Sequence, residues 1–416
     1  MKQITLSHGS GGEETHELIE NLFYKYFNND ILLQQNDSSV IDEIKGKIVV
    51  TTDSFVINPI FFNGGDIGKL SVCGTVNDLC MSGATPLYIT IAFIIEEGFL
   101  VEDLEKIVKS IGDTVKYTNV KIVAGDTKVV EKGNCEKIYI NTTGIGVIKD
   151  SDYIVNGDNI EIGDKVIVSG TIADHGISIM SSREFFQVES EIKSDCAPLN
   201  YLVRDIMNTS KNIKIMRDPT RGGLANTLKE IVDKSSKSIL LNEEDIPVKE
   251  EVMSFCEMLG LDPLYVANEG KLICIVKKED AAKVLEVMRN NELGRDAVII
   301  GEVIEDEESN LYLKNQLRYL NSIRPTEEPN QTIPQNMIFT MEDIEQNYNG
   351  ENGKPAYVVV DNVVFDVSNI ESWAGGTHFG LYSGKDLSQE FNSCHKGAIQ
   401  MLENVAPIVG YIVESQ

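Results

Sequence analysis

Apolar residues in the first 150 positions follow two alternating patterns. Short runs rich in valine and isoleucine, typical of strands, alternate with longer segments whose apolar residues recur every three or four positions, as on one face of a helix. We therefore predict helices at Glu14–Phe27, Ile67–Cys80 and Val101–Tyr117, and strands at Asn36–Ile41, Lys47–Ile57, Leu87–Ile95, Val120–Ala124 and Ile138–Ile148. This order predicts an α/β domain with a mixed sheet, which we place at residues 1–155.

A second α/β unit is predicted at residues 156–310. Its expected strands are Gly163–Gly170, Ala267–Val276 and Ala297–Ile304, and its expected helices lie within Thr171–Glu184, Asp218–Val232, Ile246–Leu259 and Ala281–Asn290. His175, which precedes a glycine, suits either a pocket wall or a structural role. From residue 311 to 336 apolar residues become sparse and three prolines gather, which predicts a semi-extended linker.

The remaining residues, 337–416, are predicted to form a small α+β domain. Thr340 and Asp343 resemble a capping box that opens a short helix. Two runs of β-branched residues around an Asp-Asn pair predict a hairpin over Ala356–Ser368. The last apolar run, IVGYIV, is expected to pack back onto it.

Charge and cysteine content narrow the functional classes. With 37 basic and 65 acidic residues among 416, the net charge is −28, which disfavours nucleic acid and anionic membranes as partners. Seven cysteines without CxxC spacing disfavour disulfide or zinc frameworks and favour a reducing cytoplasm. The N-terminus has no apolar signal core, and no stretch approaches the length of a membrane span.

Candidate chemistry is concentrated between Thr51 and Val130. Asp53, Asp66, Asp78 and Asp126 lie there among small and hydroxyl residues, and three of them follow an apolar run. Carboxylates suit Mg²⁺, and glycines let backbone amides approach an anion closely. We predict a Mg–nucleotide site without a Walker-type loop, because no GxxxxGK[ST] motif occurs.

Two other stretches could contact phosphates. The arm SHGSGG (Ser7–Gly12) is either a disordered terminus or a loop that closes over phosphates. In DPTRGGLANTLKEIV, two glycines after Arg221 stand at the entrance of a predicted helix, which would present amides and a guanidinium to an anion.

Motifs from Thr5 to about Val303 carry a family resemblance. They read HGSGG, TTDSFV, FFNGGDIGKLSVCGTVNDL, IIEEGF, GDTKVVEKG, INTTGIG, SDCAPL, RDPTRGGLANTLKEI and LGLDPLYVANEGK. In this order they resemble the HypE family of carbamoyl dehydratases, within the aminoimidazole ribonucleotide (AIR) synthetase and selenophosphate synthetase superfamily. The resemblance implies a PurM-like, two-domain α/β (α+β) architecture that binds ATP and Mg²⁺, and a homodimer formed through the N-terminal domains.

The resemblance also implies roles for individual residues. Lys128 becomes a γ-phosphate or substrate contact and Glu269 a catalytic group in the substrate pocket. The implied metal ligands are Asp37, Asp53, Asp78 and Asp126. The expected ATP- and phosphate-binding set is Gly11, Gly12, Asp37, Asp53, Asn77, Asp78, Asp126 and Arg221.

The family reaction is the ATP-dependent dehydration of an S-carbamoyl cysteine to a thiocyanate during [NiFe]-hydrogenase maturation. The amide oxygen is first phosphorylated, because phosphate is a far better leaving group than the free oxygen, and it then leaves as phosphate. Family members end in Pro-Arg-Ile-Cys, whereas the corresponding region here reads RYLNSIRPTEEPNQ and no terminal cysteine follows. We therefore expect an acceptor in trans, with a HypF-like or HypC–HypD-like maturation partner.

The C-terminal region resembles the cytochrome b5-like haem/steroid-binding domain. The resemblance rests on FTMEDIEQNYNGENGKPAYVVVDNVVFDVS, the W-x-x-G-x-H around His378, and SGKDLSQEF. It implies haem held by His378 and His395, although the HPGG motif of haem-binding members is absent. A haem-free small-molecule pocket and a pure interaction module stay open.

Two further functions compete with the dehydratase. One is a haem-based redox or sensor protein that uses the ATP-binding fold as a regulated scaffold. The other is a small-molecule kinase or synthetase of the same superfamily, disfavoured because the N-terminal arm has no reactive cysteine.

Overall fold

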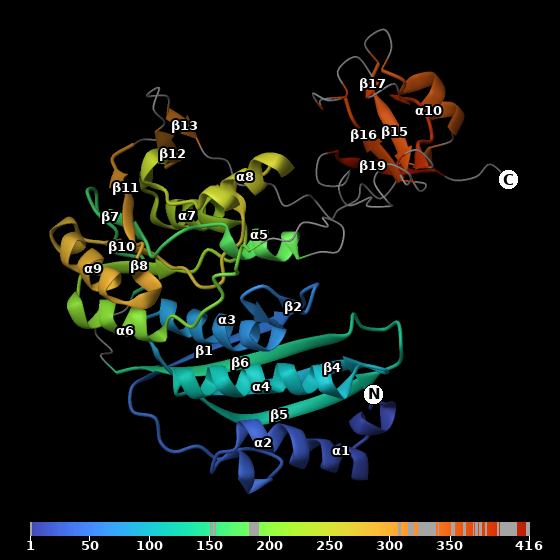
Figure 1. The fold of residues 1–416 in the computed structure, drawn as a ribbon. Coiled ribbons are helices and arrows are strands. Elements are labelled where there is room, and N and C mark those ends of the chain that lie inside the picture. The colour runs from blue at the N-terminus through green and yellow to red at the C-terminus, as the bar shows by residue number, and fades with distance from the viewer. Residues whose placement is uncertain are drawn as a thin grey trace. The chain divides into compact units, whose positions relative to one another are not determined.

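The chain divides into two compact units in this computed structural model, Met1–Pro325 and Thr326–Gln416 (Figure 1). Each unit is described by itself. The structure describes residues 2–149, 153, 155–182, 191–306, 309–314, 320–322, 338–339, 341–350, 354–360, 363–368, 370, 373, 377–378, 381–388, 391 and 406–412. Along these residues, no helix combines the length and the apolar character needed to cross a membrane.

The N-terminal half of the first unit is built on a four-stranded mixed sheet. Its strands are β1 (Lys47–Phe55), β6 (Ile138–Ile148), β4 (Thr85–Glu96) and β5 (Lys121–Val130), in that spatial order. Only β4 and β5 are parallel, and α4 (Val101–Thr118) connects them. The mixed sheet, β1 and the inward face of α4 confirm the sequence prediction.

Helices cover one face of this sheet. In Figure 1, α3 (Ile67–Met81), α4 and the helical segment α1–α2 lie side by side across it. That segment consists of α1 (Glu13–Leu18), a π-helical turn (Ile19–Phe23) and α2 (Tyr24–Phe27). Phe23 stacks on Phe93 of β4, with ring centroids 5.1 Å apart. The opposite face exposes apolar side chains: Ile48 and Val50 of β1 and Ile94 of β4. We call it the bare face.

Small residues bring α3 close to its neighbours. A Cβ on Gly68 would lie 2.5 Å from the carbonyl oxygen of Ile107, and one on Gly74 would lie 2.9 Å from the ring of Phe55. Either contact would force the helix away from α4 or β1. The close approach holds the C-terminal end of α3 beside β1, where the candidate carboxylates lie.

Two sequence predictions in this half are wrong in detail. Residues 36–41, predicted as a strand, have no regular secondary structure; Asp37 is exposed, and the Ser39 hydroxyl donates to the carbonyl of Val123. The strand predicted to end at Ala124 continues to Val130, because it pairs with β4 along its whole length. Asp126 and Lys128 therefore lie within a strand.

A seven-stranded sheet forms the other half of the unit. Its order is β13 (Leu320–Ser322), β12 (Leu311–Lys314), β9 (Ser238–Asn242), β11 (Val298–Ile304), β7 (Lys165–Val168), β10 (Ile273–Val276) and β8 (Ile213–Arg217). The accompanying helices are α5 (Asp174–Ser181), α6 (Asn200–Thr209), α7 (Gly223–Ser235), α8 (Glu250–Leu259) and α9 (Lys278–Asn290). The pattern did not indicate α6, β8 or β9. Two strands, β12 and β13, fall inside the range expected to be a linker, so the sheet extends beyond Ile304.

The two halves share a continuous apolar core. One cluster joins Ile91 of β4 and Ile107 of α4 to residues of the other half: Leu202 of α6, Cys274 of β10 and Val284 of α9. Burial of these apolar side chains away from water stabilises the placement of the two halves relative to each other.

The second unit contains a small sheet in the order β14 (Ile338–Phe339), β19 (Ile408–Ile412), β16 (Val363–Asp366) and β15 (Tyr357–Val360). The β15–β16 hairpin, the helix α10 (Met341–Asn347) and the returning strand β19 confirm the sequence prediction. A short ladder joins β17 (Thr377–His378) to β18 (Leu381–Tyr382). Phe365 and Trp373 are among the residues of the apolar core of this unit.

Candidate active site

An acidic cleft lies between the two halves of the first unit. Asp53 comes from β1 and Asp78 from the C-terminal end of α3, while Asp218 follows β8 and Glu269 precedes β10. These residues surround a cavity of about 800 Å³, which β1 and the two residues after it line from Val49 to Ile57. Both halves of the unit thus contribute carboxylates to one site.

Direct contacts tie these groups together. The Thr51 hydroxyl donates to Asp78 Oδ2 at 2.8 Å, and Asp53 shares a side-chain hydrogen bond with Asp78. Nη2 of Arg221 lies 3.9 Å from Asp53 Oδ1, and the Arg221 side chain is 91% exposed. The guanidinium therefore stands at the mouth of the cleft, free to contact an anionic ligand.

Crowding and burial disfavour negative charge in the cleft. Burial, followed by the charge of Asp78, raises the pKa of Asp53 to about 6. The same two causes raise the pKa of Asp218 to about 7. Burial first, then the neighbouring Cys196 and Asp218, hold the pKa of Glu269 well above its ordinary value. A bound cation would stabilise the ionised form of these carboxylates and so lower their pKa values.

The donor set fits Mg²⁺ shared with a ligand. Carboxylate and hydroxyl oxygens are the groups that Mg²⁺ prefers in proteins. Within the described ranges, however, no three acidic, histidine or cysteine side chains come close enough to hold an ion by themselves. Mg²⁺ usually keeps waters and binds through one or two carboxylates plus substrate phosphates. Asp53 and Asp78 fit a metal bound together with a nucleotide.

Magnesium affinity is expected to rise with pH. Protons must leave Asp53 and Asp218 before these carboxylates can attract a cation, so binding should tighten as pH rises through their pKa values of about 6 and about 7. Because both pKa values are raised by folding, the metal-free protein should lose stability from about pH 4 up to about pH 7. Magnesium titration calorimetry and thermal unfolding across this range test both signs; pH-independent affinity would contradict the assignment.

The start of α7 is shaped for an anion. Gly222 and Gly223 both adopt positive φ, 65° and 64°, and a Cβ on Gly223 would lie 2.6 Å from the carbonyl oxygen of Leu264. Only glycine fits there without a backbone shift. The first amides of this 13-residue helix follow directly after Arg221, as the sequence predicted.

A single chain does not assemble all four predicted metal ligands. Asp53 pairs in register with Thr142, which contacts Thr75 on the helix-covered face. Asp126 pairs with Ala92, which lies on the same face of β4 as Ile94, the bare face. The strand of Asp126, β5, is three strands away from β1, the strand of Asp53, which is about 14 Å at ordinary strand spacing. Asp126 therefore lies on the opposite face of the sheet, and Asp37 lies in an exposed segment.

Three other predicted residues gather at a separate cavity. Because β5 is an edge strand, Gly11, Asp126 and Lys128 can line one space of about 290 Å³ together with Phe23 and Phe93 of the helix-covered side. The backbone amide of Gly11 donates to Thr15 Oγ1 at 3.0 Å, and Gly12 is the N-cap of α1. The arm is thus ordered against β5, and its glycines lie apart from the acidic cleft.

Asn77 and Asp66 have structural positions. Asn77, predicted to bind phosphate, is 1% exposed; its amide donates to the carbonyls of Ala197 and Glu269, and its oxygen accepts from the amide of Leu199. It fastens α3 to the second half of the unit and has no group left for a phosphate. Asp66 caps α3 by accepting from the amides of Gly68 and Lys69.

Asp218 is the residue that sequence reasoning missed. Its segment DPTRGG drew attention only through Arg221 and the glycines. The signal was present, because an aspartate at the end of a strand beside an anion-binding turn is a typical metal ligand position. Because the sequence prediction did not include β8, it did not show that Asp218 lies at the end of a strand.

The predicted haem ligands belong to the C-terminal unit. His378 belongs to β17, but its side chain lies outside the described residues, as do all of His395 and Cys394. Haem ligation by His378 and His395 stays a prediction.

Two sheets joined at a carboxylate-lined cleft define the class of AIR synthase-related proteins. Residues 35–148 match the AIR synthase related protein N-terminal domain, and residues 161–314 match its C-terminal domain. Residues 340–413 match the cytochrome b5-like heme/steroid binding domain. These three matches confirm the resemblances and the fold class expected from the sequence.

More narrowly, the chain belongs to the carbamoyl dehydratase HypE family. It is 50% identical over 305 residues to carbamoyl dehydratase HypE of Bradyrhizobium diazoefficiens, covering 73% of this chain and 88% of that protein. It is 41% identical over 310 residues to the Escherichia coli K12 protein, covering 73% and 92%.

Solved structures of the family superpose on the first unit's fold. A crystal structure of HypE in complex with ATP is 42% identical, with a TM-score of 0.75 covering 78% of this chain and 98% of that one. A HypE–HypF complex gives 49% identity and a TM-score of 0.65, covering 74% and 99%.

Proposed function

We propose that this chain is an ATP-dependent carbamoyl dehydratase that converts an S-carbamoyl thiol to a thiocyanate for hydrogenase maturation. The observation that carries the proposal is the acidic cleft, where Asp53, Asp78 and Asp218 face the amides and guanidinium at the start of α7. Carboxylates for a divalent cation beside donors for an anion suit Mg–ATP. The relatives named HypE support the reaction type.

Each group has a distinct part in the proposed reaction. Asp53, Asp78 and Asp218 would hold Mg²⁺, which when bound would neutralise charge on the transferred phosphoryl group. The carbamoyl oxygen attacks the γ-phosphorus, and ADP leaves as the bond between that phosphorus and the bridging oxygen breaks. The C–O bond then breaks as phosphate leaves, and the nitrogen gives up its two protons to form the nitrile. Glu269 accepts one of these protons, and the departing phosphate takes the other. Because burial raises its pKa, Glu269 is a stronger base when ionised than an exposed carboxylate.

A second copy of the chain is proposed to complete the site. Asp126 and Lys128 lie on the bare face, away from the cleft of their own chain. The same face exposes Ile48 and Val50 near the free edge of β1. Exposed apolar strands of this kind are normally covered in the working assembly. A homodimer through this face would bring Asp126 and Lys128 toward the cleft of the other copy.

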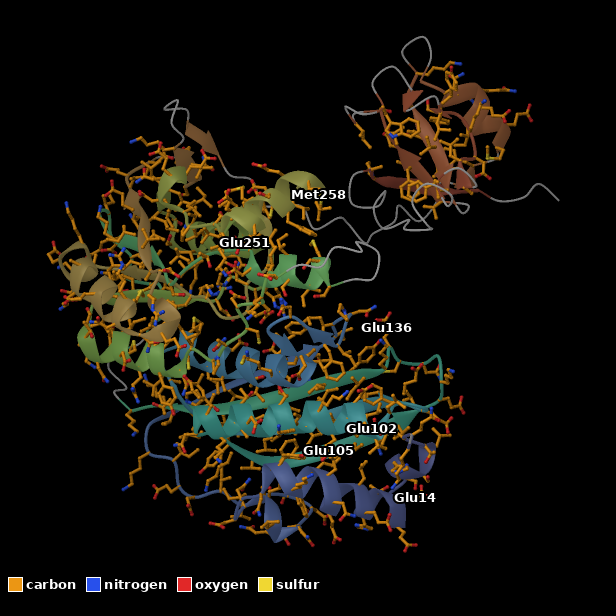
Figure 2. All side chains as sticks on the ribbon, in the orientation of Figure 1. Glu14, Glu102, Glu105, Glu136, Glu251 and Met258 are labelled. Carbon is orange, nitrogen blue, oxygen red and sulfur yellow. The ribbon has the colours of Figure 1, made fainter. Side chains whose placement is uncertain are left out.

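Val50→Lys is expected to weaken this dimer. Val50 is 62% exposed on the bare face, so a charge there would have to be buried on association. Sedimentation should show a shift from dimer to monomer at micromolar concentration, together with loss of turnover. Met258→Lys is the matched control, because Met258 is 60% exposed on α8 of the other half (Figure 2). Equal behaviour of the two variants would contradict the proposed interface.

The acceptor thiol is proposed to belong to another molecule. The region that corresponds to the family's cysteine-ending tail contains no cysteine. The six cysteines that the structure describes are Cys73, Cys80, Cys135, Cys196, Cys256 and Cys274, and all are buried. None of these thiols is placed to receive a carbamoyl group. A HypF-like protein, as in the complex of a relative, is the proposed partner, and a HypC–HypD-like pair is the alternative.

Loss of water from a supplied peptide tests the function. A synthetic peptide ending in S-carbamoyl cysteine is incubated with the protein and Mg–ATP, and mass spectrometry follows conversion of the carbamoyl group to the cyano group. Conversion that needs both Mg²⁺ and ATP supports the dehydratase. ATP hydrolysis without change in the peptide would favour a kinase or synthetase of the same superfamily.

The C-terminal unit is proposed to bind haem through His378 and His395. Support comes from the family match over residues 340–413. A steroid-type pocket without haem fits the same match, and absorption of the reconstituted protein in the Soret region separates the two.

A further inference from the structure

The cleft changes character along its length. At one end, Thr51 and Asp53 of β1 lie beside Asp78 of α3. Toward the other end, the ring of Phe55 lies against Gly74, and Leu70 packs with Phe55 and Ile57. Because β1 and α3 run in opposite directions here, the carboxylates lie at one end of the cleft and the apolar residues at the other. The charges of Asp218 and Asp53 act on Glu269.

His175 stands at the apolar end. It lines the cavity, is 6% exposed, and packs edge-on against Phe62, with ring centroids 5.6 Å apart at 89°. Phe62 belongs to the same apolar cluster as Leu70. Within the described part of the chain, His175 is the imidazole that borders the acidic cleft.

A hydrogen bond to Ser194 bears on which ring nitrogen of His175 carries the proton. Nδ1 of His175 lies 2.8 Å from Ser194 Oγ, and the same Oγ accepts from the backbone amide of Cys196 at 3.0 Å. The Ser194 hydroxyl has one proton to donate, and with His175 Nδ1 as its acceptor the neutral ring carries its own proton on Nε2. Burial lowers the pKa of His175, which keeps the ring neutral, although Asp195 opposes the shift.

The backbone around this pair is rigid. The amide of Ser194 donates to the carbonyl of Asn63 at 2.8 Å, and the amide of Gly176 donates to the carbonyl of Ala267 at 3.1 Å. A Cβ on Gly176 would lie 2.5 Å from Val266. Among the described residues, the printed hydrogen bond of the His175 ring is made by Nδ1, which leaves Nε2 for a ligand in the cavity that His175 lines. A preorganised N–H donor of this kind suits an oxygen that gains negative charge, as the carbamoyl oxygen does when its bond to carbon breaks.

We propose that His175 donates its Nε2–H to the oxygen of the substrate's carboxamide, with the substrate's aliphatic stem against Phe55 and Leu70. This assignment rests on the proposed function and names the acceptor end of the same cleft. The phosphates occupy the carboxylate end, and Glu269 lies at the amide nitrogen. Ser194 is a positioning residue, because its hydroxyl selects the tautomer that donates. The oxygen is held where phosphorylation takes place.

Paired substitutions test the donor. In His175→Gln the side-chain amide reaches the position of Nε2, whereas in His175→Asn it replaces Nδ1. With the S-carbamoyl peptide as substrate, kcat/KM should fall on the order of a hundredfold in His175→Asn, and His175→Gln should recover most of that loss. Mg–ATP affinity by calorimetry should match the wild type in both. Equal turnover in all three proteins, or weaker ATP binding in both variants, would overturn the inference.

A second readout keeps the inference separate from the proposed reaction. Imidazole ¹⁵N shifts of histidine-labelled protein, assigned with His175→Gln, should show protonation at Nε2 in the wild type and a mixture of tautomers in Ser194→Ala. A proton on Nδ1 in the wild type would overturn the role of His175. If the wild type binds the peptide but does not dehydrate it, the proposed function fails. Peptide affinity, measured in the presence of a non-hydrolysable ATP analogue, then tests the role of His175 by itself. Weaker peptide binding in His175→Asn than in His175→Gln supports the donor, and equal binding refutes it.

Discussion

Asp53→Ala is expected to abolish magnesium-dependent ATP turnover, with a loss on the order of a thousandfold or more. Asp53 shares a hydrogen bond with Asp78 and faces Arg221 across 3.9 Å, so its removal takes one carboxylate from the cation and one partner from the guanidinium. Its raised pKa indicates that the metal-free fold gains nothing from its charge. Thermal unfolding should therefore show a variant as stable as the wild type, while the rate of phosphate release collapses.

Asp66→Ala is the matched control for this experiment. Asp66 belongs to the same stretch but caps α3 through the amides of Gly68 and Lys69. Loss of an N-cap costs about 1 kcal/mol of stability and should leave turnover near the wild-type rate. An inactive Asp66→Ala together with an active Asp53→Ala would remove Asp53 from the metal site.

Glu269→Gln should stop dehydration while ATP still binds. The substitution keeps the shape of the side chain, and the backbone of residue 269 stays held by Asn77 and by Asp195, which accepts the amide of Glu269 at 3.1 Å. What is lost is the proton acceptor, an effect of about a hundredfold to ten-thousandfold on kcat. The measurement is peptide conversion by mass spectrometry beside calorimetric ATP affinity.

Glu230→Gln separates this effect from a general loss of charge. Glu230 lines the same cavity but is 57% exposed and pairs with Arg217 at 2.6 Å. It should retain turnover within a few-fold, since exposed ion pairs contribute little. Wild-type conversion by Glu269→Gln would assign the proton transfer to another group.

The sequence indicated the elements better than the way their side chains meet. Helix α4 and strand β1 follow from apolar spacing, because burial on one face imposes that spacing directly. The face on which an aspartate points depends on strand register, which no local pattern reveals. Asp53 and Asp126 therefore looked equivalent in the sequence, although pairing places them on opposite faces.

Residues with two plausible uses were the hardest to assign. Asn77 precedes Asp78 at the end of one helix, yet burial engages Asn77 with backbone groups and leaves Asp78 facing the cleft. Asp66 showed the same ambiguity between a helix cap and a ligand. Asp218 required knowledge of β8, a strand with only five residues. Such distinctions arise from tertiary contacts that the order of residues does not show.

The placement of Asp53 and Asp126 on opposite faces of one sheet has a genetic consequence. If each working site combines the cleft of one chain with the bare face of another, chains carrying Asp53→Ala and chains carrying Asp126→Ala are each inactive alone. Mixed pairs would contain one doubly damaged site and one intact site. Co-expression in equal amounts would then restore roughly a quarter of the normal activity through random pairing in a two-fold assembly, so two null alleles would complement each other.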